Sequence, residues 1–67
     1  MSTTRIDRIL EAHPDVSEDD ARNLLVLAYL NANQLGLNVN QHMEETTNKL
    51  AAMKPHAIES LITSIRK

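Results

Sequence analysis

A run of seven residues, Leu24-Leu25-Val26-Leu27-Ala28-Tyr29-Leu30, lies near the middle of a chain of only 67 residues and limits how that chain can fold. The run belongs to a longer segment, 17–35, that reads as one helix. Ser17 is a suitable N-cap, because its hydroxyl can accept the backbone N–H of Asp20 and the Asp20 carboxylate can reach back. Gly36 predicts the end of the helix, because glycine adopts the left-handed conformation that follows a last helical turn.

Residues placed 100° apart around this helix form two apolar sides. The longer side runs the whole length of the helix and consists of Ala21, Leu24, Leu25, Ala28, Ala32 and Leu35. The second side is apolar only in the middle, at Val26, Leu27 and Leu30. A helix that is apolar all round is normally buried all round. The second side is therefore either core, covered by the chain's own helices, or a surface for a partner.

The size of the chain favours the partner surface. A chain of this length buries only about 60% of its unfolded surface, and small domains usually add disulfides, metals or association. The sequence has no Cys, and Tyr29 is its single aromatic residue. We therefore expect a homodimer, with Tyr29 as the strongest single contact, because tyrosine is enriched among the energetically dominant residues of interfaces.

The remaining sequence predicts two or three further helices. Thr3 or Thr4 can cap a first helix, whose apolar stripe is Ile6, Ile9, Leu10 and His13 and which ends before Pro14. Asn38 or Asn40 can cap a third helix. The apolar stripe of this third helix is Val39, Met43, Thr46, Leu50, Met53 and Ala57, whereas Thr47 is counted among its polar residues.

Pro55 is expected to interrupt the C-terminal segment, because proline costs about 3 kcal/mol inside a helix but suits its first residue. The apolar stripe that follows Pro55 also faces a different direction from the stripe of the third helix. It consists of Ile58, Leu61, Ile62 and Ile65. The sequence thus predicts an all-α fold, a small bundle of three to four helices built on an antiparallel helical hairpin. We expect a helix break near Pro55 and a single domain over residues 1–67. Whether 39–67 forms one kinked helix or two is left open.

The charges argue against two classes of partner. The net charge is −2, and acidic and basic residues are interspersed. Nucleic-acid binding needs a clustered basic patch, and a membrane-surface helix needs a basic face.

The apolar run is too short to span a bilayer, and residues 1–7 lack the apolar core of a signal peptide. We therefore expect a cytoplasmic protein.

Side chains suited to catalysis or metal binding are sparse. Ser17, Ser60 and Ser64 have no neighbouring His and acid in a recognisable arrangement, so we expect no catalytic residues, no cofactor and no small-molecule substrate. His42 and Glu45 share one helical face, but a metal site needs several such pairs. Metal binding is the weaker alternative.

A small DNA-binding regulator is the other alternative. In a helix-turn-helix arrangement, Asn40, Gln41 and Lys49 would face the duplex. His13 is interpreted as a residue at the end of a helix, where the dipole favours it, rather than as a pH sensor or ligand.

Two short stretches resemble known families. The stretch 5–16, followed by a leucine-rich helix, resembles the start of a ubiquitin-binding CUE domain, although the second helix is longer and the family's Phe-Pro motif reads His13-Pro14 here. The stretch 36–40 after an apolar helix is similar to a segment of the small AriR-type biofilm and two-component connector proteins. That resemblance implies a helical dimer acting by protein contact.

The sequence therefore predicts a small non-enzymatic protein–protein interaction module, a bacterial or phage regulator or adaptor. It would act as a homodimer by binding another protein. The residues expected at the partner or dimer interface are Val26, Leu27, Tyr29, Leu30, Leu61 and Ile65.

Overall fold

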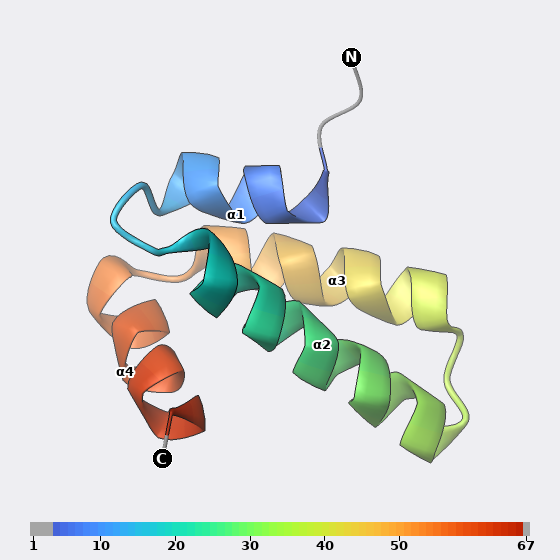
Figure 1. Cartoon of the computed structure of the whole chain (residues 1–67). Helices are drawn as coiled ribbons and strands as arrows, with labels where there is room; N and C mark the ends of the chain where they lie inside the picture. The colour runs from blue at the N-terminus through green and yellow to red at the C-terminus, as the bar shows by residue number, and fades with distance from the viewer. Residues whose placement is uncertain (1–3, 67) are drawn as a thin grey trace.

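The computed structural model describes residues 4–66, and these residues contain four α-helices and no strand. The helices are α1 (Arg5–Ala12), α2 (Glu18–Leu35), α3 (Val39–Ala52) and α4 (Pro55–Ile65) (Figure 1). The predicted all-α bundle is confirmed. The segment after Val39 is two helices, because α3 ends at Ala52 and Pro55 is the first residue of α4.

Local capping signals set the beginnings of the first three helices. The Thr4 side chain accepts the Asp7 N–H at 3.1 Å, and the Asp7 carboxylate accepts the Thr4 N–H, which completes a capping box. Ser17 and Asn38 cap α2 and α3 in the same way, each through one side-chain oxygen. Thr3, the other predicted cap of α1, lies outside the described residues.

Gly36 ends α2 in the left-handed region, with φ 69°. The Gly36 N–H donates to the Asn33 carbonyl and the Leu37 N–H donates to the Ala32 carbonyl, which is the Schellman arrangement. Only Gly36, Leu37 and Asn38 separate the two helices, and α3 runs back beside α2, so the predicted helical hairpin is present.

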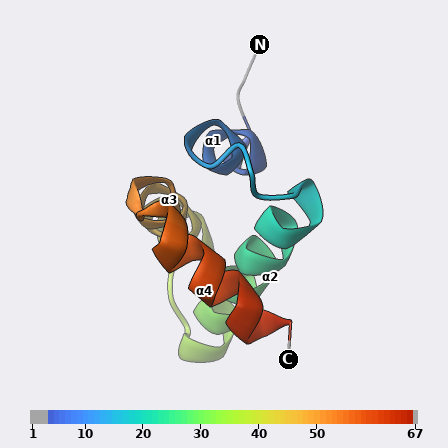
Figure 2. The same cartoon turned by 90° about the vertical axis from the view of Figure 1, so that its left-hand side faces the viewer.

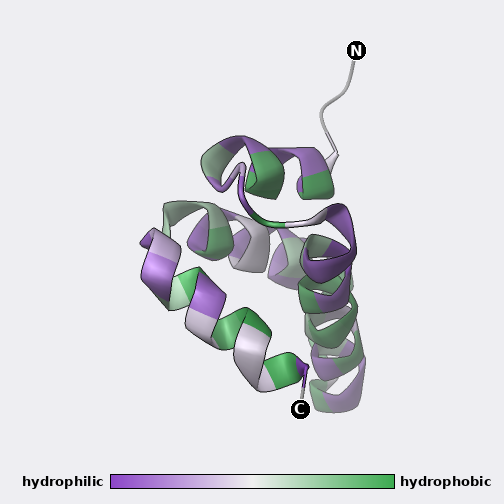
Figure 3. Ribbon diagram, turned by 60° about the vertical axis from the view of Figure 1, so that its left-hand side comes forward, coloured by the Kyte–Doolittle hydropathy of each residue, from purple (hydrophilic) through white to green (hydrophobic). Residues whose placement is uncertain are grey.

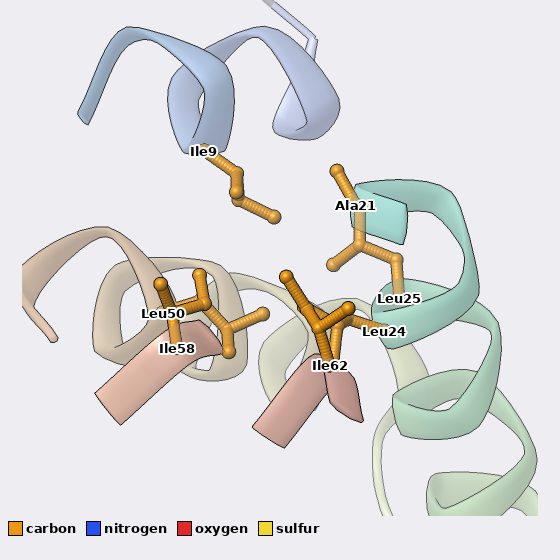
Figure 4. Packing of buried hydrophobic residues seen from close by; sticks show 7 residues of the cluster. All are labelled: Ile9, Ala21, Leu24, Leu25, Leu50, Ile58 and Ile62. Carbon is orange, nitrogen blue, oxygen red and sulfur yellow. The ribbon is translucent and has the colours of Figure 1, made fainter. Parts of the chain in front are cut away.

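The other two helices cover the end of the hairpin that is distant from this turn. Helix α1 runs alongside α3 and lies over the beginning of α2, and α4 runs from the end of α3 toward α2 (Figures 1 and 2). The core lies where the four helices meet (Figure 4). Seven buried side chains form it: Ile9, Ala21, Leu24, Leu25, Leu50, Ile58 and Ile62. Ile9 and Ile58 are almost fully enclosed, so truncating either to alanine is expected to cost about 2–5 kcal/mol.

Two positions differ from what helical periodicity predicts. Thr47, expected on a polar face, is fully buried. Its hydroxyl donates to the Met43 carbonyl one turn earlier at 2.7 Å, so the polar atom is satisfied and the methyl group packs like that of valine. Leu35 lies on the predicted apolar side of α2 but is exposed, because it sits beside the turn, beyond the reach of α1 and α4.

Polar contacts also join helices that are distant in sequence. The buried His13 ring lies with Nε2 2.7 Å from the Leu50 carbonyl, in the last turn of α3. Because a carbonyl oxygen only accepts, Nε2 carries the proton. His13 therefore ties the end of α1 to the end of α3, which is a more specific role than a favourable helix dipole.

Three ion pairs make further contacts of this kind. The Asp20 carboxylate accepts two hydrogen bonds from Arg66, the shorter at 2.6 Å, and so ties the start of α2 to the end of α4. Asp20 therefore does not complete the predicted capping box with Ser17. Arg5 and Arg8 of α1 both contact Glu44 of α3. The hydrogen bond from Arg8 is the largest effect and lowers the pKa of Glu44 below its usual value of 4.5. Desolvation, the second largest effect, raises this pKa, and the positive charges of Arg8 and Arg5 lower it further.

Candidate protein-binding surface

The middle of α2 carries four large apolar or aromatic side chains that the rest of the chain leaves half uncovered. Val26 and Leu27 are each 47% exposed, Tyr29 is 48% exposed and Leu30 is 55% exposed. We call these four residues the outer face of α2. Helices α1, α3 and α4 cover the opposite side of α2, which the buried Ala21, Leu24, Leu25, Ala28 and Ala32 occupy. The apolar second side of α2 is thus not core within this chain.

A groove continues this surface from α2 toward α4. It has a volume of about 620 Å³ and is open to solvent. Leu27 and Leu30 line its α2 side, Leu50 lies at its base on α3, and Leu61 and Ile65 line its α4 side. Figure 3 shows apolar segments on both α2 and α4, the two helices that border the groove. Four of the six predicted interface residues, Leu27, Leu30, Leu61 and Ile65, therefore line one groove, whereas Val26 and Tyr29 lie on α2 outside it.

The two α4 residues of this set differ in exposure. Leu61 is 36% exposed, whereas Ile65 is less exposed and packs against the core. Ile65 thus contributes to the fold as well as to the groove wall. The exposed apolar area is centred on α2, and α4 supplies its edge.

Polar residues bound the outer face at both ends of α2. Arg22, Asn23, Asn33 and Gln34 are all exposed. The Arg22 guanidinium lies 3.2 Å from the Asp19 carboxylate and 3.6 Å from that of Glu18, all on the same helix. A central apolar patch with a polar rim is the usual composition of a protein–protein interface.

Of the residues of the two alternative functions, His42 lines the groove and the others lie elsewhere. Asn40 and Gln41 are exposed in the first turn of α3, but the Gln41 amide donates to Glu45 at 3.3 Å. Lys49 is exposed on the same helix. His42 is half-buried beside the groove, and within residues 4–66 no three His, Cys, Asp or Glu side chains gather as a metal site requires.

Sequence periodicity identified this surface but could not decide between core and interface. The decision depends on where α1 and α4 pack, and no local signal gives their positions. The groove itself depends on the angle between α2 and α4 and was not predicted.

No known protein family matches the chain, and comparison with curated proteins and with solved structures finds no significant similarity. The two short resemblances noted above therefore carry no further argument. In the part of the chain that the structure describes, no helix has both the length and the apolar character needed to cross a lipid bilayer.

Proposed function

We propose that this chain is a small, non-enzymatic protein–protein interaction module, a regulator or adaptor that forms a homodimer and acts by binding another protein. The observation that carries the proposal is the outer face of α2, four half-exposed apolar side chains beside an open apolar groove. Exposed apolar patches that polar residues surround mark interaction sites on small soluble domains.

The fold supports this role because the core does not use the patch. The seven core residues come from all four helices and none belongs to the outer face. Helix α2 is also capped at both ends, by Ser17 and by the Gly36 turn, so it presents the patch on a defined element. A surface that is not required by the core and lies on a rigid helix is suited to binding.

Sedimentation equilibrium over a wide dilution series, with circular dichroism on the same samples, tests the proposal. We expect a monomer–dimer equilibrium in which the helical signal persists after dissociation, because the core is complete in one chain. A Leu27→Asp variant should remain helical and monomeric, since a charge at the centre of the patch would have to be desolvated on association.

The matched control is Leu35→Asp, which places the same charge at an exposed leucine of α2 outside the outer face. This variant should dimerise like the original chain. A chain that stays monomeric up to millimolar concentration would contradict self-association. Equal loss of dimer in both variants would contradict the assignment of the surface.

A further inference from the structure

We infer that a pocket between the α1–α2 connection and α4 binds a lysine side chain of the other protein. The pocket has a volume of about 490 Å³ and lies where residues 12–16 approach α4, at one end of the molecule (Figures 1 and 2). Within residues 4–66, it shares no lining residue with the groove between α2 and α4. The inference rests on the proposed function and specifies the chemical group that the partner brings.

The buried ring of His13 gives this pocket a hydrogen-bond acceptor. Nε2 donates its proton to the Leu50 carbonyl, so the neutral ring has a lone pair on Nδ1. Nδ1 makes no hydrogen bond within residues 4–66, and it is not sealed in the core, since Arg5 Nε is the only fully enclosed side-chain nitrogen or oxygen there that lacks a hydrogen-bond partner. His13 lines the pocket and is only 5% exposed, so we place Nδ1 at the pocket surface.

Two carboxylates add negative charge to the same pocket. Asp15 in the connection and Glu59 on α4 both line it, and neither is in an ion pair within residues 4–66. Among the described residues of the lining, Arg66 is the only arginine or lysine, and it already pairs with Asp20. Three carboxylates against one guanidinium leave the lining with two uncompensated negative charges.

The sequence around the connection extends this negative charge beyond the pocket. Residues 11–20 include five carboxylates and neither lysine nor arginine: Glu11, Asp15, Glu18, Asp19 and Asp20. Arg22 compensates part of this charge through its contacts with Glu18 and Asp19. A basic segment of a partner would therefore be attracted to this end of the molecule.

The shape and donors of lysine fit the pocket better than those of other cations. Its ammonium carries three N–H donors, and His13, Asp15 and Glu59 offer three acceptor groups without partners. The walls also include apolar side chains suited to the methylene stem of lysine, from Val16, Ile58 and Ile62. Arginine prefers one carboxylate in a bidentate pair, and the carboxylate of Asp20 already holds Arg66 in this way. The lining also lacks the three gathered ligands that a metal ion requires, within the described part of the chain.

Nuclear magnetic resonance tests the inference with a defined probe, the tripeptide Gly-Lys-Gly blocked at both ends. The ring signals of His13 are followed as the peptide is added, and the same peptide with an acetylated lysine is the control. We expect a saturable shift with a millimolar dissociation constant for the lysine peptide. The acetylated peptide should give no such shift, because acetylation removes the positive charge.

Two variants separate the pocket from general attraction by negative charge. Glu59→Gln should weaken binding about fivefold, the ratio that corresponds to one contact between opposite charges in water. Glu11→Gln removes the same charge from an exposed residue of the same end that does not line the pocket. It should change the dissociation constant less than about twofold, because salt screens charges that are not in contact. Circular dichroism checks that both variants remain helical.

Three results would overturn the inference. They are equal shifts with the acetylated peptide, equal weakening by the two variants, and no saturable shift of the His13 signals with the peptide at tens of millimolar. If the chain still dimerises in the sedimentation experiment, such a result contradicts the lysine pocket alone. A chain that binds the lysine peptide but stays monomeric would support the pocket and contradict only the homodimer.

Discussion

Replacing Leu30 with alanine should weaken the dimer while leaving the helices in place. Leu30 has the most exposed side chain of the outer face, at 55%. Alanine is the strongest helix former, so the change removes apolar surface without disfavouring α2. The expected result is a higher dissociation constant with a helical signal close to that of the original chain.

The magnitude follows from the surface that the partner would cover. Leucine has three more carbons than alanine, and burying each contributes about 0.8 kcal/mol, or about 2.4 kcal/mol for complete burial. About half of that, 1.3 kcal/mol, corresponds to the exposed 55% of Leu30. Because both copies of the proposed homodimer carry the change, the dimer should lose about 2.6 kcal/mol, which is about a 70-fold increase in the dissociation constant.

Leu35→Ala is the matched control, because Leu35 is 63% exposed on the same helix and lies outside the outer face. Sedimentation equilibrium on both variants and the original chain gives the three dissociation constants. An unchanged constant for Leu30→Ala would refute the assignment of the outer face. A similar increase in the dissociation constant of Leu35→Ala would show that the effect comes from lost apolar surface in general and not from a specific contact of Leu30.

Three further predictions concern the fold and are measured by urea unfolding. Gly36→Ala should destabilise the chain by about 1 kcal/mol, because φ is +69° there, although a Cβ would meet no atom within 4 Å. Asp20→Asn should cost about 1 kcal/mol through the lost ion pair to α4, whereas Asp19→Asn, in the same first turn, should change stability by less than about 0.5 kcal/mol. The depressed pKa of Glu44 means that its contact with Arg8 stabilises the fold above pH 4.5 and that this contribution is lost as the pH falls through the lowered folded-state pKa. Glu44→Gln should therefore be less stable than the original chain at pH 7, and the difference should shrink as the pH falls below 4.5.

The helix boundaries could be predicted from the sequence because they depend on local chemistry. Thr4, Ser17 and Asn38 each bond to a backbone N–H three residues later, and Gly36 and Pro55 act through their own backbone geometry. None of these signals needs information from a distant part of the chain. The hairpin and the break near Pro55 followed from them, whereas the choice between one kinked helix and two after Val39 was left open.

Contacts between distant residues were not predictable in the same way. Asp20 pairs with Arg66 instead of its own cap residue, and His13 bonds to Leu50. Both depend on how α1 and α4 pack on the hairpin. The exposure of the outer face has the same origin, since helical periodicity shows that Val26 and its neighbours are apolar but not what covers them.

The attachment of α4 has a consequence for local stability. Helix α4 packs least against the rest of the bundle, through Ile58, Ile62 and the Arg66 ion pair, and the groove separates its outer side from α2. Opening α4 alone therefore requires less free energy than global unfolding, and its amide hydrogens should exchange with solvent faster than those of α2 and α3. A second copy bound beside Leu61 would slow the exchange of these α4 amides. Hydrogen exchange in α4 would therefore detect dimer formation at α2.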